Sequence, residues 1–373
     1  MPSRIQNQLS VLRRSRGISA SDLAQSAGVS RQTIYAIEAG SFIPNTEVSL
    51  LLAQTLEVRV EEIFSLTQDK PKRNDQIQTE SLSTQKPVKG QAVRLGHVGD
   101  RLVSIPVHAT PYFLPEADGV ISKLGRNLAS TWLTVFAKDE ALQKNLVLAG
   151  CDPAIGLISG IVAKLSGVEL ISAPASSRLA LQWLKEGKVH IAGSHLEDPA
   201  TGEFNIPFVR RQFPDGDFTV VNFARWEEGW LTAPANPSGI EDATSLTRRG
   251  IRFINREPGS GSRALLDQQL NKCKIKSDKI RGYDSIAFGH LAAAYAVSSG
   301  QADACLATRS AARAFGLHFI PLQSERYDFV IRKSSLDIPA VQTFLDILQR
   351  ASLRRKLEVL AGYDTSQTGA TLA

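Results

Sequence analysis

The chain of 373 residues lacks any run of about 18 apolar residues, so its sequence predicts no membrane span. Its first ten residues, MPSRIQNQLS, also lack the apolar core of a signal peptide. The three cysteines, Cys151, Cys273 and Cys305, fit neither a disulfide framework nor the spacing of metal ligands. We therefore expect a cytoplasmic protein with reduced cysteines, no membrane partner and no resident metal or other cofactor.

Common catalytic motifs are absent as well. Ser260 lacks the G-x-S-x-G frame of a nucleophile elbow, and the sequence holds no HExxH metal motif. The segment from Gly259 to Ala264 does not match the glycine fingerprint of a dinucleotide site. We therefore expect that the protein is not an enzyme. A hydrophobic content of 43% and a charged content of 21% describe a globular chain, and 373 residues allow two or three domains.

Residues 18–40, ISASDLAQSAGVSRQTIYAIEAG, predict two short helices around a turn at Gly28. Ser30 is placed to cap the second helix, and Ile34 and Ile37 give that helix a buried stripe. The first turn of the second helix then carries Arg31, Gln32 and Thr33. A helix-turn-helix protein presents side chains to the major groove of DNA from this position. An ordinary helical hairpin is the alternative interpretation of this segment taken alone.

Flanking segments extend the pattern to five helices. We expect one helix over residues 5–16 and two more after Asn45, the last of them ending near Phe64. This order and the segment SRQTIYAIEAGSFIP resemble the XRE family of phage-repressor-like DNA-binding domains over residues 4–66. The resemblance implies an all-α helix-turn-helix domain at residues 1–66, a double-stranded DNA operator and a homodimer.

The XRE resemblance also implies roles for single residues. It makes Arg31, Gln32 and Thr33 readers of base edges, since Arg and Gln suit bidentate contacts to guanine and adenine. The side chains implied to position DNA phosphates are Arg14, Arg16, Tyr35 and Asn45. The chain departs from the family at Ala20, where Gln is frequent, and at Glu57, where Gly or Asn is preferred. The first departure removes a polar contact to DNA, and the second costs a little stability.

The composition changes after the first domain. Residues 67–91 hold no aromatic residue and few apolar ones, which predicts a flexible, mildly basic linker. Residues 92–144 alternate like strands and predict a small β-rich unit that packs on the next domain. From 145 to 373, strands and helices alternate, which predicts an α/β domain with a mostly parallel sheet in a multidomain chain. Within it we expect strands over 219–223, 230–233 and 327–332 and a helix over 284–299.

Three strand-to-helix junctions of this domain are candidate anion sites. They supply Cys151 and Asp152 at the first junction, Ser176 and Ser177 at the second, and Ser260, Gly261, Ser262 and Arg263 at the third. Backbone N–H groups and hydroxyls at helix N-termini bind oxyanions, and such junctions gather at one edge of an open α/β sheet. His195 and Tyr327 complete the candidate set. Each serine has an alternative role as a helix cap, both rings have an alternative role in the core, and His290 is expected to be structural.

Three segments, LAGCDPAIGLISG, RFINREPGSGSRALLD and GHLAAAYAVSSGQADACLA, resemble the periplasmic-binding-protein-like domain that occurs fused to helix-turn-helix domains and beside molybdopterin-biosynthesis domains. The resemblance covers residues 145–332. It implies a type II binding-protein fold, in which two α/β lobes are joined by two crossing strands and the ligand lies in the cleft. The other domains found beside this family imply molybdate or tungstate as the effector.

The sequence therefore predicts a DNA-binding transcriptional regulator whose C-terminal domain senses a small oxyanion. Arg178 stands where the second junction of the family is slimmer, and an extra arginine favours an organic or phosphorylated anion. That effector is an alternative, and so is a ligand-free C-terminal domain that serves only for assembly. An enzyme or an anion carrier is the remaining alternative.

Overall fold

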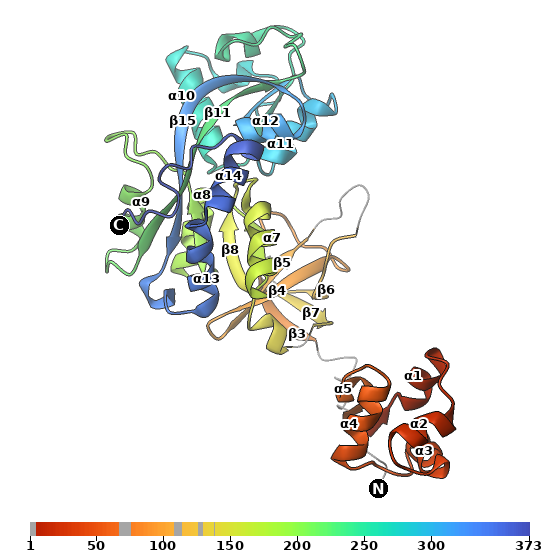
Figure 1. Cartoon of the computed structure of the whole chain (residues 1–373). Coiled ribbons are helices and arrows are strands. Elements are labelled where there is room, and N and C mark those ends of the chain that lie inside the picture. The colour runs from red at the N-terminus through yellow and green to blue at the C-terminus, as the bar shows by residue number, and fades with distance from the viewer. Residues whose placement is uncertain (1–4, 67–75, 108–113, 126–129, 138) are drawn as a thin grey trace. The chain divides into compact units, whose positions relative to one another are not determined.

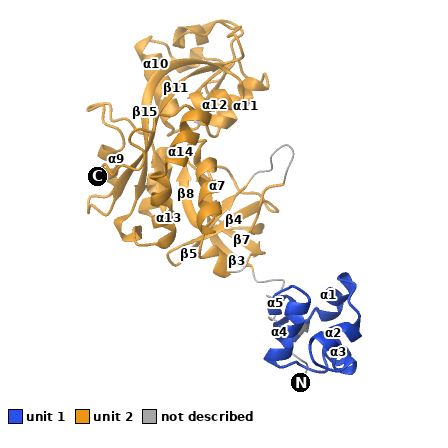
Figure 2. Cartoon of the chain, viewed as in Figure 1, with its two compact units in different colours: residues 1–75 blue, residues 76–373 orange. Residues whose placement is uncertain are grey.

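The computed structural model describes residues 5–66, 76–107, 114–125, 130–137 and 139–373. The chain forms two compact units, residues 1–75 and residues 76–373 (Figure 2). Among the helices within the described ranges, none is both long and apolar enough to cross a membrane.

Residues 5–66 form a bundle of five short helices. These are α1 (Leu9–Ser15), α2 (Ala20–Ser26), α3 (Arg31–Glu38), α4 (Thr46–Thr55) and α5 (Val60–Ile63). Side-chain oxygens of Ser19, Ser30 and Asn45 accept hydrogen bonds from backbone N–H groups in the first turns of α2, α3 and α4. Such caps satisfy N–H groups that have no partner within the helix, which is why these three helices begin at those residues.

A two-stranded sheet closes the first unit. Strand β1 (Ile5–Asn7) pairs antiparallel with β2 (Phe64–Leu66). The helix predicted over residues 5–16 is therefore wrong at its start, and Phe64 lies in a strand rather than in the last helix. The Asn7 side chain explains the first difference, because its Oδ1 accepts a hydrogen bond from the Leu9 N–H at 2.8 Å and so sets the start of α1.

The second unit begins with a closed five-stranded barrel in the order β3-β5-β4-β6-β7. Its strands are β3 (Ile77–Ser81), β4 (Ala92–Val98), β5 (Arg101–Pro106), β6 (Gly119–Leu124) and β7 (Ser130–Val135). The linker predicted over 67–91 is thus wrong in its C-terminal part, because β3 pairs with β5 and β7. Its N-terminal part, 67–75, lies outside the described residues.

The weak apolar signal of β3 has a physical cause. The Thr79 hydroxyl is buried 3.0 Å from Ser104 Oγ and 3.2 Å from Thr131 Oγ1. A network of buried hydroxyls therefore holds part of the barrel together in place of apolar contacts. After the barrel, the short helix α6 (Asp139–Leu142) leads to the α/β domain. The Asn145 amide there donates to the Leu95 carbonyl at 2.8 Å, so the barrel packs on that domain.

The α/β domain is built on an eight-stranded mixed sheet in the order β13-β12-β14-β11-β15-β10-β8-β9. Strands β11 (Thr219–Thr232) and β15 (His318–Ile331) run antiparallel through both lobes, side by side (Figure 1). One lobe holds β8 (Leu146–Gly150), β9 (Leu170–Pro174), β10 (Ile191–Ser194), α7 (Ile155–Ser166), α8 (Ser177–Lys185) and α9 (Ile206–Gln212). The other holds β12 (Phe253–Arg256), β13 (Ile286–Ala287), β14 (Ala304–Thr308), α10 (Gly261–Lys272), α11 (His290–Ser298) and α12 (Arg309–Ala314). Helices α13 (Pro339–Leu348) and α14 (Ala351–Lys356) follow. The two lobes and two crossing strands confirm the expected architecture.

The crossing strands are longer than the sequence predicts. The strands expected at 219–223 and 230–233 are the two ends of the single strand β11, and 327–332 covers only the second half of β15. The middle of β11 resembles a loop in sequence because it carries charged residues, yet Glu228 there is fully buried. The helix predicted over 284–299 is also wrong at its start. Strand β13 comes first, and Gly289, with φ of +96°, turns the chain into α11.

Candidate functional site

The predicted base-reading side chains stand at the start of α3. Arg31 and Gln32 are exposed, and the Arg31 guanidinium donates to the Tyr35 hydroxyl at 3.0 Å. The Thr33 hydroxyl lies 2.8 Å from Ser30 Oγ, so it takes part in capping the helix. Arg31 and Gln32 are therefore the freer of the three to reach a DNA base.

The predicted phosphate-positioning residues are all exposed, but three of them have partners within the unit. Arg16 lies 3.5 Å from the Glu57 carboxylate, and the Asn45 side-chain oxygen caps α4. The Tyr35 hydroxyl accepts from Arg31, and the structure gives Arg14 no such contact within the described residues. None of the seven side chains predicted to contact DNA is buried. Their contacts with DNA stay predictions.

A buried ion pair holds α3 against α1. Arg13 Nε lies 2.6 Å from Glu38 Oε1, and both side chains are about one-tenth exposed. The same guanidinium donates to the Ile18 carbonyl at 3.0 Å, at the turn before α2. The pair therefore fixes the helix with the predicted base readers relative to the helix that precedes the motif.

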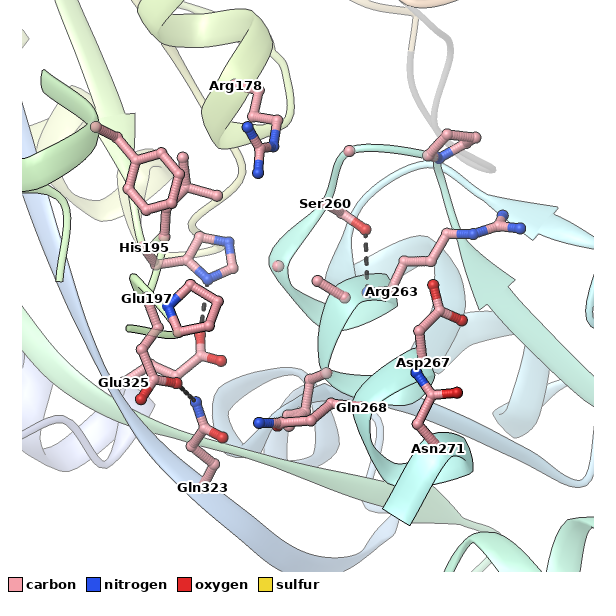
Figure 3. A pocket seen from close by; sticks show the side chains of 18 of the residues that line it. Arg178, His195, Glu197, Ser260, Arg263, Asp267, Gln268, Asn271, Gln323 and Glu325 are labelled. Atoms are coloured by element: carbon pink, nitrogen blue, oxygen red, sulfur yellow. Dashed lines mark hydrogen bonds and ion pairs between the residues drawn. The ribbon is translucent and has the colours of Figure 1, made fainter. Parts of the chain in front are cut away.

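The ligand-site candidates gather where the two lobes meet. A cavity of about 720 Å³ lies between the starts of α8 and α10, lined by Arg178 and His195 on one side and by Ser260, Gly261 and Arg263 on the other (Figure 3). A second cavity of about 250 Å³ is lined by Cys151 and Asp152 of one lobe and by the start of α11 in the other lobe. The first and third predicted junctions thus line different cavities.

Several predicted ligand contacts are engaged within the protein. The Ser177 hydroxyl accepts from the His195 N–H at 3.2 Å, and the Ser262 hydroxyl donates to Glu228 Oε1 at 2.8 Å. Ser176 is buried against the third junction, since a Cβ at Gly259 would lie 3.6 Å from its Oγ. Tyr327 is fully buried beneath the cleft, beside the His195 ring. The geometry therefore leaves Ser260, Gly261, Arg263 and His195 as the predicted residues that border the larger cavity.

The centre of the lobe contact is a cluster of buried titratable side chains. His195 Nδ1 lies 2.7 Å from Glu325 Oε2, and its Nε2 lies 3.4 Å from Cys151 Sγ. In the other lobe, His290 Nδ1 lies 3.5 Å from Glu228 Oε1. We call Cys151, His195, Glu228, His290 and Glu325 the interlobe cluster. Its carboxylates and imidazoles differ from the hydroxyl and backbone N–H groups that the sequence predicts for an oxyanion site, which stays a prediction.

Burial shifts the proton affinities of this cluster. It raises the pKa of Glu228 to about 8, and the charge of Glu325 adds to the shift. Burial lowers the pKa of His290 well below its usual range. Burial also disfavours the charged form of His195, but the neighbouring Cys151 and Glu325 outweigh that effect and raise its pKa. Nearby, burial raises the pKa of Asp152 to about 7. These shifts favour a charged His195 and a neutral His290 in the folded protein.

Sequence reasoning missed three members of the interlobe cluster. His290 was expected to be structural, and neither Glu228 nor Glu325 entered the candidate set, although both are buried at the crossing strands. No local motif marks these residues, because they come from strands and helices that are distant in the sequence. A run of charged residues inside an otherwise apolar β11 is the one available signal.

Two α/β lobes that are joined by two crossing strands around a cleft define the class of periplasmic-binding-protein-like domains. The model of the PBP superfamily domain matches residues 160–349, about half of the chain, and a helix-turn-helix model matches residues 9–63. The chain therefore belongs to the PBP superfamily domain family and carries an XRE-type helix-turn-helix domain at its N-terminus.

Relatives match both parts of the chain. The protein YvgK of Bacillus subtilis is 34% identical over 225 residues, which are 60% of this chain and 72% of YvgK. The HTH-type transcriptional regulator MJ0272 of Methanocaldococcus jannaschii is 37% identical over 65 residues, which are 17% of this chain and 98% of that protein. Among solved structures, the sulfate-binding protein SubI from Mycobacterium tuberculosis has 16% identity and a TM-score of 0.44, covering 59% of this chain and 86% of SubI.

Proposed function

We propose that this protein is a transcriptional regulator that binds operator DNA as a homodimer and senses a small anion, molybdate or tungstate first, in the larger cleft cavity. The observation that carries the proposal is the meeting of two helix starts across the cleft. Helices α8 and α10 begin on opposite lobes, and both begin at the cavity. The N-terminal ends of helices carry partial positive charge and unpaired N–H groups, which favour an anion between them.

Arg178 adds full charge to this site. Its side chain points toward the gap between His195 and Ser260 (Figure 3). The guanidinium lies 5.3 Å above the Phe208 ring, which keeps it at the cavity wall. An anion held by Arg178 and the start of α10 would contact both lobes and so favour the closed cleft. A ligand that binds the closed state more tightly than the open state shifts the equilibrium between them toward the closed state.

A second candidate effector is a larger organic or phosphorylated anion. The cavity volume of about 720 Å³ favours it, because a tetrahedral oxyanion would fill only a small part of such a space. Part of the cavity wall is apolar and is formed by Leu196, Pro199 and Phe208. A metal oxyanion does not need such an apolar surface.

The experiment is a calorimetric and thermal-shift titration of the full chain with molybdate, tungstate, sulfate, phosphate and a panel of phosphorylated organic acids. A ligand present at about 100 times its Kd adds roughly 2.7 kcal/mol to the free energy of unfolding. Molybdate or tungstate should stabilise the protein, and Arg178→Gln should weaken this effect. The matched control is Arg210→Gln, an exposed arginine of α9 in the same lobe. Stabilisation by phosphorylated acids alone would favour the second candidate, and no response to any compound would exclude both.

DNA binding needs its own test. Gln32→Ala should lower operator affinity by about 1–3 kcal/mol if Gln32 makes a bidentate base contact. Gln54→Ala is the matched control, because Gln54 is exposed on α4 rather than on α3. Selected operator sequences and gel-shift titrations measure both variants. An equal loss in the two variants, or none in Gln32→Ala, would contradict the assignment of α3 as the reading helix.

A further inference from the structure

The interlobe cluster brings metal-ligand atoms together from both lobes. Cys151 Sγ and ring nitrogens of His195 and His290 all lie within 4.8 Å of one another. A second group, formed by a ring nitrogen of His195 and carboxylate oxygens of Glu228 and Glu325, also lies within 4.8 Å. We propose that this cluster binds a divalent transition-metal ion of the Zn²⁺ class through Cys151, His195 and His290, whose ligand atoms all lie within 4.8 Å of one another. The inference does not depend on the proposed anion effector, because Arg178 and the start of α10 would hold the anion, and His195 is the only proposed metal ligand that borders the larger cavity.

Distances between the ligand atoms suit a tetrahedral ion. Zn²⁺ bonds to sulfur at about 2.3 Å and to nitrogen at about 2.0–2.1 Å, so two such ligands at a tetrahedral angle stand roughly 3.5 Å apart. Cys151 Sγ and His195 Nε2 stand 3.4 Å apart. An ion can therefore enter between this pair with little movement of either side chain.

The surroundings of His195 match those of a metal-bound histidine. Its Nδ1 donates to Glu325 Oε2 at 2.7 Å, which leaves Nε2 directed at Cys151. The Trp226 indole N–H donates to the same carboxylate oxygen at 3.3 Å and holds it in place. Metal-ligating histidines usually give their second N–H to a carboxylate in this manner, which fixes the tautomer and the ring orientation. Glu325 is therefore assigned as the residue that positions His195.

Unpartnered polar atoms give an independent reason for a ligand here. Both ring nitrogens of His290 and the Oε2 atom of Glu228 are buried and make no hydrogen bond with any described residue. Buried polar atoms without a partner are rare and costly, and each needs an explanation such as an ion or a water molecule. Glu228 Oε1 is already bonded to Ser262, and it lies 3.5 Å from His290 Nδ1. A metal ion bound to one ring nitrogen of His290 would give that buried atom a partner.

The donor set selects the kind of metal. One thiolate and two imidazoles are soft or borderline ligands that favour Zn²⁺, Co²⁺, Ni²⁺ or copper over Mg²⁺ and Ca²⁺. The thiolate of Cys151 supplies one negative charge to a divalent ion, and the carboxylates of Glu228 and Glu325 lie close to His195. Cys151 and His195 follow β8 and β10 in one lobe, whereas His290 begins α11 in the other lobe. Metal binding would thus join the two lobes directly and hold the cleft closed.

Cobalt substitution tests the site. Full-length protein that has been stripped with a chelator is titrated with Co²⁺, and the absorption spectrum is recorded. We expect a near-ultraviolet charge-transfer band from the thiolate and a visible band of tetrahedral intensity, both removed by added Zn²⁺. Cys151→Ser should remove the charge-transfer band, whereas Cys273→Ser, a change at the exposed free cysteine, should keep it. Absence of the band in the wild type, or its loss only in Cys273→Ser, would overturn the proposal.

Histidine variants and X-ray absorption complete the test. His290→Gln should weaken Zn²⁺ binding at least tenfold in competition with a chromophoric chelator, while His318→Gln, at an exposed histidine, should leave it unchanged. If a variant fails to fold by circular dichroism, the zinc absorption spectrum of the wild-type protein decides. One sulfur neighbour with nitrogen and oxygen neighbours supports the site, and a shell without sulfur overturns it.

Discussion

Gly261 lies directly against the imidazole of His195, so that the first residue of α10 in one lobe touches the end of β10 in the other. A Cβ at position 261 would stand 2.4 Å from Cε1 and 2.7 Å from Nδ1 of that ring. The ring cannot swing aside cheaply, because Glu325 holds its Nδ1 and the side chain is almost fully buried. Glycine at this position is therefore what allows the two lobes to close.

Gly261→Ala should consequently hold the lobes apart or strain the closed state. We expect a loss of about 1–3 kcal/mol in the free energy of unfolding, the usual cost of overpacking. Denaturant unfolding of the full chain measures it. Gly160→Ala is the control, because a Cβ there meets nothing within 4 Å and alanine is the better helix former within α7. Equal stability of wild type and Gly261→Ala would show that the contact is not tight.

The buried pair of Arg13 and Glu38 predicts a stability effect in the helix-turn-helix unit. Glu38→Gln removes the negative charge beside the largely buried Arg13 guanidinium, and we expect a loss of about 1–3 kcal/mol in the stability of that unit. Glu57→Gln makes the same chemical change in an exposed pair with Arg16 and should cost under about 1 kcal/mol. Far-ultraviolet circular dichroism during thermal unfolding compares the two. Similar losses would contradict a special role for the buried pair.

Glu57 offers a stabilising change. Its φ is +51°, in the left-handed region, and it directly follows Leu56, the C-cap of α4, where a side chain with a Cβ is strained. Glu57→Gly should therefore raise the stability of the helix-turn-helix unit by about 0.5–1 kcal/mol. The same thermal unfolding measurement tests it, with Glu57→Ala as the comparison that keeps the Cβ. A gain in both variants would point to the lost charge rather than to the backbone.

His190 predicts a dependence of stability on pH. Burial lowers its pKa from 6.5 to about 4, and its Nδ1 accepts from the Val147 N–H at 3.0 Å. Between those two values the unfolded chain takes up a proton that the folded protein refuses. The contribution of His190 is therefore fully present above about pH 6.5 and is lost as the pH falls toward 4, by roughly 3 kcal/mol in all.

His190→Asn keeps an acceptor for the Val147 N–H but cannot titrate in this range. Its stability should therefore fall less steeply than that of the wild type between pH 6.5 and 4. Denaturant midpoints measured at several pH values compare the two proteins. If the stability of the two proteins falls equally steeply with falling pH, other groups cause the acid sensitivity.

Local signals in the sequence predicted the first unit well. The periodic apolar residues of α2 and α3, with the cap at Ser30, depend on neighbours within a few positions along the chain. The errors in the predicted elements lie where the hydrogen-bonding partner of a segment is distant in the sequence. Strand β3 exists because β5 and β7 supply its hydrogen bonds, and its buried Thr79 leaves no apolar pattern to detect.

The candidate site also combines features that the sequence predicted with features that only the tertiary structure decided. The sequence alone determined the helix-turn-helix and the junctions that hold Cys151 and Ser260, since each depends on short-range order. The two-lobed architecture was implied only by the family resemblance. Only the tertiary structure decided that Glu228, His290 and Glu325 join Cys151 and His195 between the lobes. These side chains stand on separate strands and helices, so their chemistry arises from the crossing of β11 and β15 and from lobe contact, which no local pattern encodes.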